Sequence, residues 1–126
     1  MLRYHRQVYF SQEDIIRLRD FTDKINPLIW QYTKHCIDNL KYRAINIEGV
    51  LRFIKGIILK PDLIFEFYAD DISQVIIKAC YRVRYNDDID LILVIGKDKQ
   101  IITIYYNSAG DSHITLKKEL YQKGIK

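Results

Sequence analysis

The spacing of the apolar residues changes at Pro61, and this change constrains the fold more than any other feature of the chain. Upstream of Pro61, apolar side chains recur at helical spacing, which is typical of helices that bury one face. Downstream, short apolar segments rich in β-branched and aromatic residues are separated by turn residues, which is typical of strands. We therefore expect an α+β fold in one domain, residues 1–126, with N-terminal helices packed on a roughly four-stranded antiparallel sheet.

The first half of the chain carries start and stop signals for its helices. An extended lead-in over residues 1–10 ends at Ser11, which can cap a first helix, with Asp14 near the positive end of the helix dipole. Asn26-Pro27 stops this helix and can start a second one. The expected helices cover residues 12–24, residues 27–42, and a third segment capped by Asn46 and ended by Gly56.

The second half is expected to form an antiparallel meander. Its strands cover residues 63–68, 75–85, 89–95 and 100–106. In the second strand, apolar residues from Val75 to Tyr85, including Ile77, alternate with a basic row, defined here as Lys78, Arg82 and Arg84. A sheet face with such a row can hold a phosphate backbone, although a solvated outer face has the same pattern.

Composition favours a polyanionic partner without requiring one. The 126 residues hold 20 Lys and Arg against 16 Asp and Glu, for a formal charge of +4, and 10 Tyr. Tyrosines near cations can stack on single-stranded nucleic acid, but they also favour strands. Cys36 and Cys80 are too sparse for a disulfide framework, no apolar run is long enough for a membrane span, and the first residues lack a signal-peptide core. We therefore expect reduced thiols and a soluble cytoplasmic protein.

Histidines and hydroxyl side chains supply the residue types that RNA cleavage by 2′-hydroxyl attack needs. This reaction uses a base, an acid, and cations or hydrogen-bond donors around the pentavalent phosphorane. Histidine suits the first two roles because its ordinary pKa lies near 6.5. The candidates are His35 and His113 for proton transfer, Arg43, Arg82 and Arg84 for charge, and Thr103, Tyr105 and Thr115 as donors. Each histidine has a plain alternative, because His113 can be an ordinary loop residue and His35 a half-buried helix residue.

Other chemistries find no motif in the chain. Neither the nucleotide-binding P-loop nor the dinucleotide fingerprint is present, and no spacing of Cys or His supports zinc. The acidic pairs Asp70-Asp71 and Asp87-Asp88 fall at expected turns, where Asp is favoured for backbone reasons. We therefore expect no cofactor and no metal.

Several short motifs resemble one known group of proteins. Tyr32-Thr-Lys-His35 with Lys41-Tyr-Arg43-Ala-Ile45 is similar to a helix that opens with Ser/Thr-x-His and closes with Glu-Arg-Gly-Ile. Ile101-Ile-Thr103-Ile-Tyr105 is similar to a final Ile-Thr-Val-Tyr strand, and Asp111-Ser-His113-Ile-Thr115-Leu116, with Leu120-Tyr121, to the ends of some polymorphic toxin domains. Together they resemble the RelE/barnase/colicin D-like superfamily of small metal-independent ribonucleases, many of which are bacterial toxins.

The resemblance implies a ribonuclease-like core over residues 27–126, with residues 1–26 as a lead-in and an extra helix. Carried over position by position, it implies a catalytic set consisting of His35, Arg43, Thr103, His113 and Thr115. Two positions depart from the pattern, because Asn39 stands where an Arg is common and Ala44 where a Gly is usual.

We therefore expect a hydrolase of toxin type that cleaves tRNA or mRNA in the cytoplasm to a 2′,3′-cyclic phosphate and a 5′-hydroxyl. Lys78, Arg82, Arg84 and Tyr105 are the expected RNA-binding residues. Such a toxin needs an antitoxin or immunity protein, which should be acidic to complement the basic face. The alternative is a non-catalytic binding protein, encoded by a phage or mobile element, that grips protein or nucleic acid with the same sheet.

Overall fold

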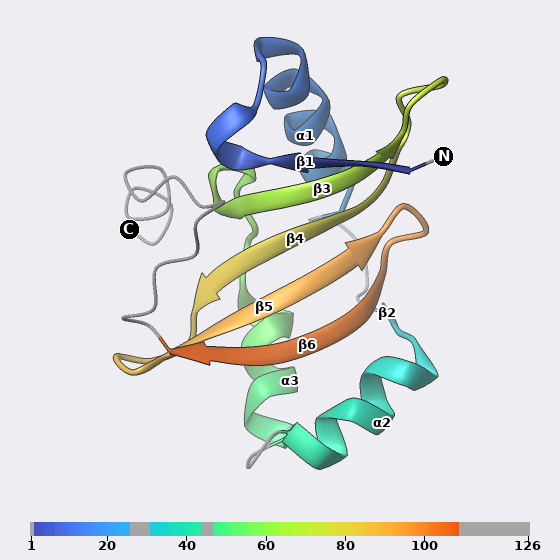
Figure 1. Ribbon diagram of the computed structural model, residues 1–126. Helices are drawn as coiled ribbons and strands as arrows, with labels where there is room; N and C mark the ends of the chain where they lie inside the picture. The colour runs from blue at the N-terminus through green and yellow to red at the C-terminus, as the bar shows by residue number, and fades with distance from the viewer. Residues whose placement is uncertain (1, 26–30, 44–46, 109–126) are drawn as a thin grey trace.

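The computed structural model of the protein describes residues 2–25, 31–43 and 47–108 (Figure 1). The helices are α1 (Gln12–Ile25), α2 (Lys34–Arg43) and α3 (Ile47–Gly56), with short 3₁₀ turns at Gln7–Tyr9 and Pro61–Leu63. The strands are β1 (Leu2–Arg6), β2 (Gln31–Tyr32), β3 (Ile64–Asp70), β4 (Ile76–Arg84), β5 (Ile89–Gly96) and β6 (Gln100–Ser108). This arrangement confirms the α+β class, with helices packed on a largely antiparallel sheet.

The strands form one sheet in the order β1-β3-β4-β5-β6-β2. The expected meander is its centre, β3 to β6, and every pair in it is antiparallel. The expected lead-in is instead strand β1, which pairs antiparallel with β3 from Leu2 opposite Asp70 to Arg6 opposite Glu66. At the other edge, β2 pairs parallel with the start of β6. The sheet is therefore larger than expected, because residues from the helical half extend both of its edges.

The helix boundaries agree with the sequence at α1 and α3 and differ at α2. The Asp14 amide donates to the Ser11 hydroxyl (3.1 Å), and the Ser11 amide donates back to the Asp14 carboxylate (3.0 Å), which forms a capping box. Helix α3 ends at Gly56, as expected. Helix α2 begins only at Lys34, because residues 31–32 pair with β6 instead of continuing a helix from Pro27. Residues 26–30 lie outside the described part of the chain.

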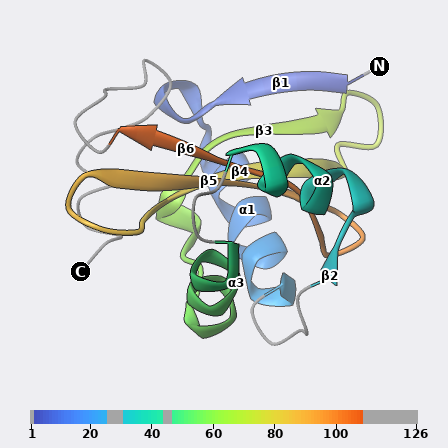
Figure 2. The same cartoon turned by 90° about the horizontal axis from the view of Figure 1, so that it is seen from below.

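Helices α1 and α3 cover one face of the sheet (Figure 2). The main core lies between these helices and the sheet. It includes Leu18 and Ile25 from α1, Val50 and Ile54 from α3, and inward residues of β3 to β6. A register shift in β4 turns Ile76 into this core and leaves Val75 49% exposed. The simple alternation expected from Val75 onward is therefore wrong at the start of this strand.

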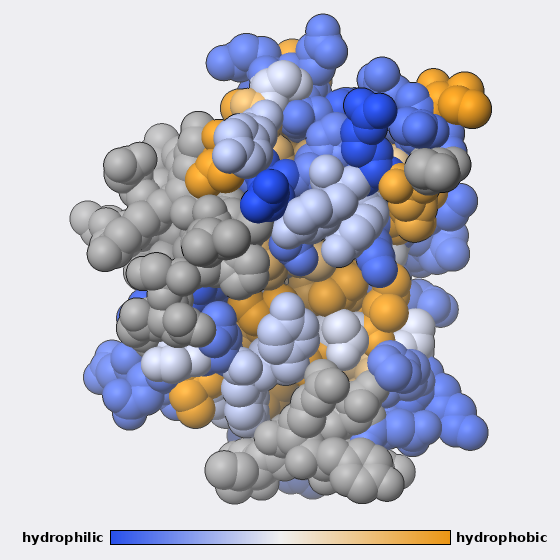
Figure 3. All heavy atoms as spheres, viewed as in Figure 1, coloured by the Kyte–Doolittle hydropathy of each residue, from blue (hydrophilic) through white to orange (hydrophobic). Residues whose placement is uncertain are grey.

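The opposite face of the sheet is called the open face here. Its centre is a second buried cluster formed by Phe65, Cys80, Ile92 and Val94, with Ile102 and Tyr105 packed against it. Figure 3 looks onto the open face and shows apolar side chains at its middle, with hydrophilic side chains around its margins. None of the helices in the described ranges has the length and apolar character needed to cross a membrane.

Candidate functional site

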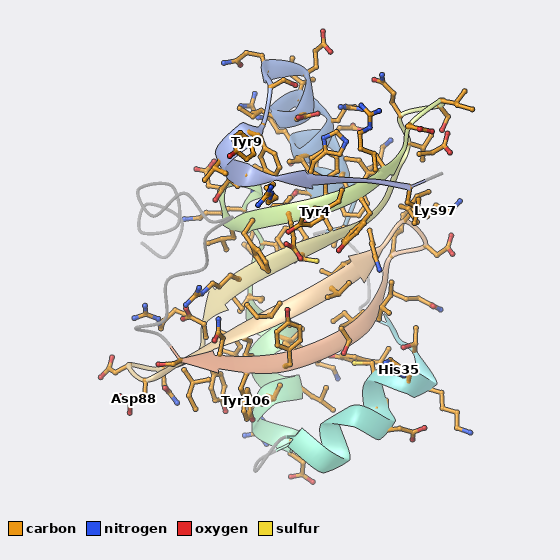
Figure 4. All side chains as sticks on the ribbon, in the orientation of Figure 1. Tyr4, Tyr9, His35, Asp88, Lys97 and Tyr106 are labelled. Carbon is orange, nitrogen blue, oxygen red and sulfur yellow. The ribbon has the colours of Figure 1, made fainter. Side chains whose placement is uncertain are left out.

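A groove between α2 and the outer side of β6 brings together three of the expected site residues. It is lined by His35 from α2 and by Thr103, Tyr105 and Tyr106 from β6, encloses about 700 Å³, and is open to solvent. Figure 4 shows His35 on the first turn of α2 and Tyr106 on β6. The groove therefore joins residues that lie far apart in the sequence.

Thr33 positions His35 relative to the sheet. Its hydroxyl accepts a hydrogen bond from the Cys36 amide (3.1 Å), which caps the N-terminus of α2. The same hydroxyl donates to the carbonyl of Ile102 (3.1 Å), and the Thr33 amide donates to the carbonyl of Ile101 (3.1 Å). Since Cys36 is also fully buried, the first turn of α2 is fixed against β6, and the exposed His35 is presented at the groove.

Strand β6 supplies the other wall, from both of its faces. Thr103 and Tyr105 pair with Val94 and Ile92 of β5, and Tyr105 packs against the open-face cluster. Tyr106 packs against the main core on the opposite side of the strand. Partial burial and, to a smaller extent, Tyr85 raise the pKa of Tyr106, so its hydroxyl stays protonated and can donate.

Tyr106 is the groove residue that the sequence did not single out. Strict alternation places Tyr105 and Tyr106 on opposite faces of a strand, so only one of them is expected at any site on the sheet. Here β6 has no long strand on its outer side, and both side chains reach the groove at this edge. The tyrosine pair itself was visible in the sequence, but its position at an edge was not.

The far end of the open face holds two tyrosines and one member of the basic row. The Tyr4 and Tyr68 rings lie 5.1 Å apart between centroids, and the Lys78 ammonium lies 4.6 Å from the centre of the Tyr68 ring. The Tyr4 hydroxyl donates to the Glu66 carboxylate. Partial burial raises the pKa of Tyr68, with a smaller contribution from Glu66. Lys78 thus lies over the Tyr68 ring, and the 41%-exposed Tyr4 offers aromatic surface near this cation, which suits a stacked base.

The other members of the basic row are tied to one carboxylate. Asp90 is fully buried and accepts a hydrogen bond from Nε of Arg82 (2.7 Å) and another from Nε of Arg84 (2.7 Å). The Arg82 side chain is 1% exposed and also donates to the carbonyl of Ser108 (3.1 Å), whereas the Arg84 side chain is 34% exposed. Arg82 is thus part of the interior, and Arg84 and Lys78 are the row members that remain accessible to a ligand.

Of the three remaining expected residues, only Arg43 lies in the part of the chain that the structure describes. Arg43 is the last residue of α2. His113 and Thr115 lie outside the described residues. Within residues 2–25, 31–43 and 47–108, no three His, Cys, Asp or Glu side chains are grouped as a metal ion requires.

The groove has the components of an acid–base site but holds one histidine among the residues that are described. The exposed imidazole of His35 is a candidate proton-transfer group, and threonine and tyrosine hydroxyls can donate hydrogen bonds to a phosphate. The described residues therefore supply one proton-transfer group and several donors.

A scan against protein-family models and searches of curated proteins and of solved structures found no significant match to this chain. A function is therefore inferred from its own residues.

Proposed function

We propose that the protein is a metal-independent endoribonuclease of toxin type that cleaves RNA in the groove between α2 and β6. The observation that carries this proposal is the meeting of His35 with Thr103 and Tyr105 in one open groove. The resemblance of the motifs around His35 and Thr103 to the RelE/barnase/colicin D-like superfamily supports the same reading.

In the proposed reaction, the 2′-hydroxyl of the substrate attacks the adjacent phosphorus and the bond to the 5′-oxygen of the next nucleotide breaks. One group removes the 2′-hydroxyl proton and a second protonates the departing 5′-oxygen, which leaves a 2′,3′-cyclic phosphate and a 5′-hydroxyl. His35 takes one of these roles, and His113 is proposed for the other. The hydroxyls of Thr103 and Tyr105 donate to the phosphorane oxygens, and the positive end of the α2 dipole favours its negative charge.

The open face is proposed to hold the RNA on either side of the cleaved bond. Tyr4 offers an exposed ring for stacking near the Lys78 cation, and Arg84 offers a partly exposed guanidinium to a phosphate. An acidic antitoxin or immunity protein that covers the groove would block this surface and protect the RNA of the host cytoplasm.

A non-catalytic binding protein remains the second candidate, and one observation favours it. The positive charges of Arg82 and Arg84 share the buried carboxylate of Asp90, so the open face has less free positive charge than the basic row suggested. An aromatic groove with one described histidine can bind a ligand without cutting it.

The deciding experiment incubates the purified chain with total cellular RNA in the presence of EDTA. The His35→Ala and His113→Ala variants are compared with His5→Gln, a matched control because His5 lies on β1 outside the groove. Discrete cleavage that is lost with His35 and kept in the control supports the proposal. Intact RNA with folded wild-type protein, or full cleavage by folded His35→Ala, refutes it.

A Tyr105→Phe variant tests the role of the hydroxyl. Phenylalanine keeps the packing of Tyr105 against the open-face cluster but removes the donor. Losing one transition-state donor lowers kcat by roughly 10²–10³-fold where the donor is well placed. An unchanged kcat would assign Tyr105 to RNA binding alone.

A further inference from the structure

A second pocket lies between α1 and the two turns that join β3 to β4 and β5 to β6. It has a volume of about 330 Å³ and shares no lining residue with the groove that holds His35. Figure 4 labels Lys97 at the β5–β6 turn, one of the turns that border this pocket. A volume of this size lies at the lower end of the range for small-molecule sites.

The walls of this pocket are held in place before any ligand binds. Arg17 on α1 donates to both the carbonyl (3.1 Å) and the side-chain oxygen (3.2 Å) of Gln74, so the β3–β4 turn is tied to the helix. The Asp70 carboxylate, at the start of the β3–β4 turn, accepts a hydrogen bond from the Ser73 amide (2.7 Å). Hydrogen bonds from Ser73 lower the pKa of Asp70. At the β5–β6 turn, the Lys97 amide donates to the carbonyl of Ile77 (2.9 Å).

Both turns hold a non-glycine residue in the left-handed backbone region, and both residues line the pocket. Gln74 has a φ of 62° and Lys99 a φ of 67°. Such conformations cost energy for residues other than Gly, Asn and Asp and are concentrated at functional sites. Of the residues that the structure describes, these two are the only ones other than glycine with positive φ.

The pocket carries an excess of positive charge. Four cations line it, and two of them have acidic partners: Arg17 pairs with Asp14, and Lys24 pairs with Asp20 at 3.0 Å. Lys97 and Lys99 are exposed, and none of the described carboxylates lies within ion-pair distance of either. Two exposed lysines that line the pocket are therefore available to a ligand.

Part of the pocket lining is apolar. It includes the half-buried ring of Phe21, the buried Ile76 and the half-exposed Val75. Phe21 offers an aromatic surface on which a flat ring can stack, and Val75 offers an aliphatic one. The ligand should therefore combine an anionic group with a flat apolar body.

We propose that this pocket binds a nucleoside monophosphate unit, with its phosphate at Lys97 and Lys99 and its base against Phe21 and Val75. Lysine ammonium groups bind phosphate as point charges, and a base that stacks on an aromatic ring needs no specific hydrogen bonds. The unit can be a free nucleotide or one nucleotide of a single-stranded RNA. This binding needs no catalysis in the His35 groove and does not rest on the proposed function.

The test is a titration of the ¹⁵N-labelled full chain, followed by NMR, with adenosine monophosphate, adenosine or inorganic phosphate. A separate arm uses a short single-stranded oligoribonucleotide in the His35→Ala background, so that cleavage cannot confuse the result. The key variant is Lys97→Gln with Lys99→Gln. Its matched control is Lys55→Gln, an exposed lysine on α3 outside the pocket.

We expect adenosine monophosphate or the oligonucleotide to shift the amide signals of Gln74, Val75 and Lys99. The double lysine variant should weaken that binding on the order of tenfold, and Lys55→Gln should not. Binding of the mononucleotide identifies a free nucleotide as the ligand, and binding of the oligonucleotide alone identifies a nucleotide within a strand. The proposal is overturned if neither ligand shifts these signals, if the double variant binds as well as the control, or if inorganic phosphate binds as tightly as the nucleotide.

Discussion

Replacing Asp90 with Ala should destabilise the protein far more than replacing Arg84, the more exposed of its two arginine partners, with Gln. Asp90 is fully buried and neutralises Arg82, whose side chain is 1% exposed. Without Asp90 the Arg82 guanidinium would remain in the interior with no counter-charge, and breaking a buried pair in this way costs about 3–5 kcal/mol. For a domain of this size the loss lowers the melting temperature by roughly 10–20 °C. Arg84→Gln removes a partly exposed partner and should cost no more than about 1 kcal/mol.

Urea denaturation, monitored by circular dichroism, measures the free energies of unfolding of Asp90→Ala and Arg84→Gln relative to wild type. A third variant, Arg82→Met with Asp90→Leu, replaces the buried pair by apolar side chains and should lie within about 1–2 kcal/mol of wild type or above it. A cost of less than about 1 kcal/mol for Asp90→Ala, or a cost no larger than that of Arg84→Gln, would show that Asp90 is not the counter-charge that the interior needs.

Three further predictions concern a half-buried histidine, the two buried thiols and a buried hydrogen bond. Burial lowers the pKa of His5 below 6.5, so the unfolded chain binds a proton at His5 more readily than the folded chain does. The free energy of unfolding should therefore fall as pH drops from 6.5. In urea titrations between pH 5 and 7, His5→Phe should make this dependence on pH weaker. Burial raises the pKa of Cys36 to about 11 and of Cys80 to about 12, so both should react with Ellman's reagent at pH 8 only after unfolding; fast labelling of the native protein would contradict this. Tyr81→Phe removes a buried hydrogen bond to Thr22 (2.8 Å) and should cost about 1–3 kcal/mol, much of which Thr22→Val in the same chain should recover if the unsatisfied hydroxyl is the cause.

Local signals in the sequence predicted much of the fold. The capping box at Ser11 and Asp14, the end of α3 at Gly56 and the four strands of the meander all depend on residues a few positions apart. Such signals are readable because backbone hydrogen bonds within a helix, and alternation along a strand, follow the chain itself.

The sequence also named His35, Thr103 and Tyr105 from their chemistry, but not where they meet. Their groove exists because Thr33 ties α2 to β6, a contact between residues far apart in the chain. In the same way, Arg82 and Arg84 were expected to be alike, and only the packing around Asp90 separates a buried arginine from an accessible one.

Local patterns along the chain were thus enough to predict the secondary structure of the meander, the start of α1, the α+β class and the residue types available for chemistry. The tertiary structure alone decided that the first residues pair as β1, that residues 31–32 join the sheet, and which cations remain accessible. The physical reason is that strand pairing and burial depend on contacts between residues distant in the chain, which local propensity and periodicity do not specify.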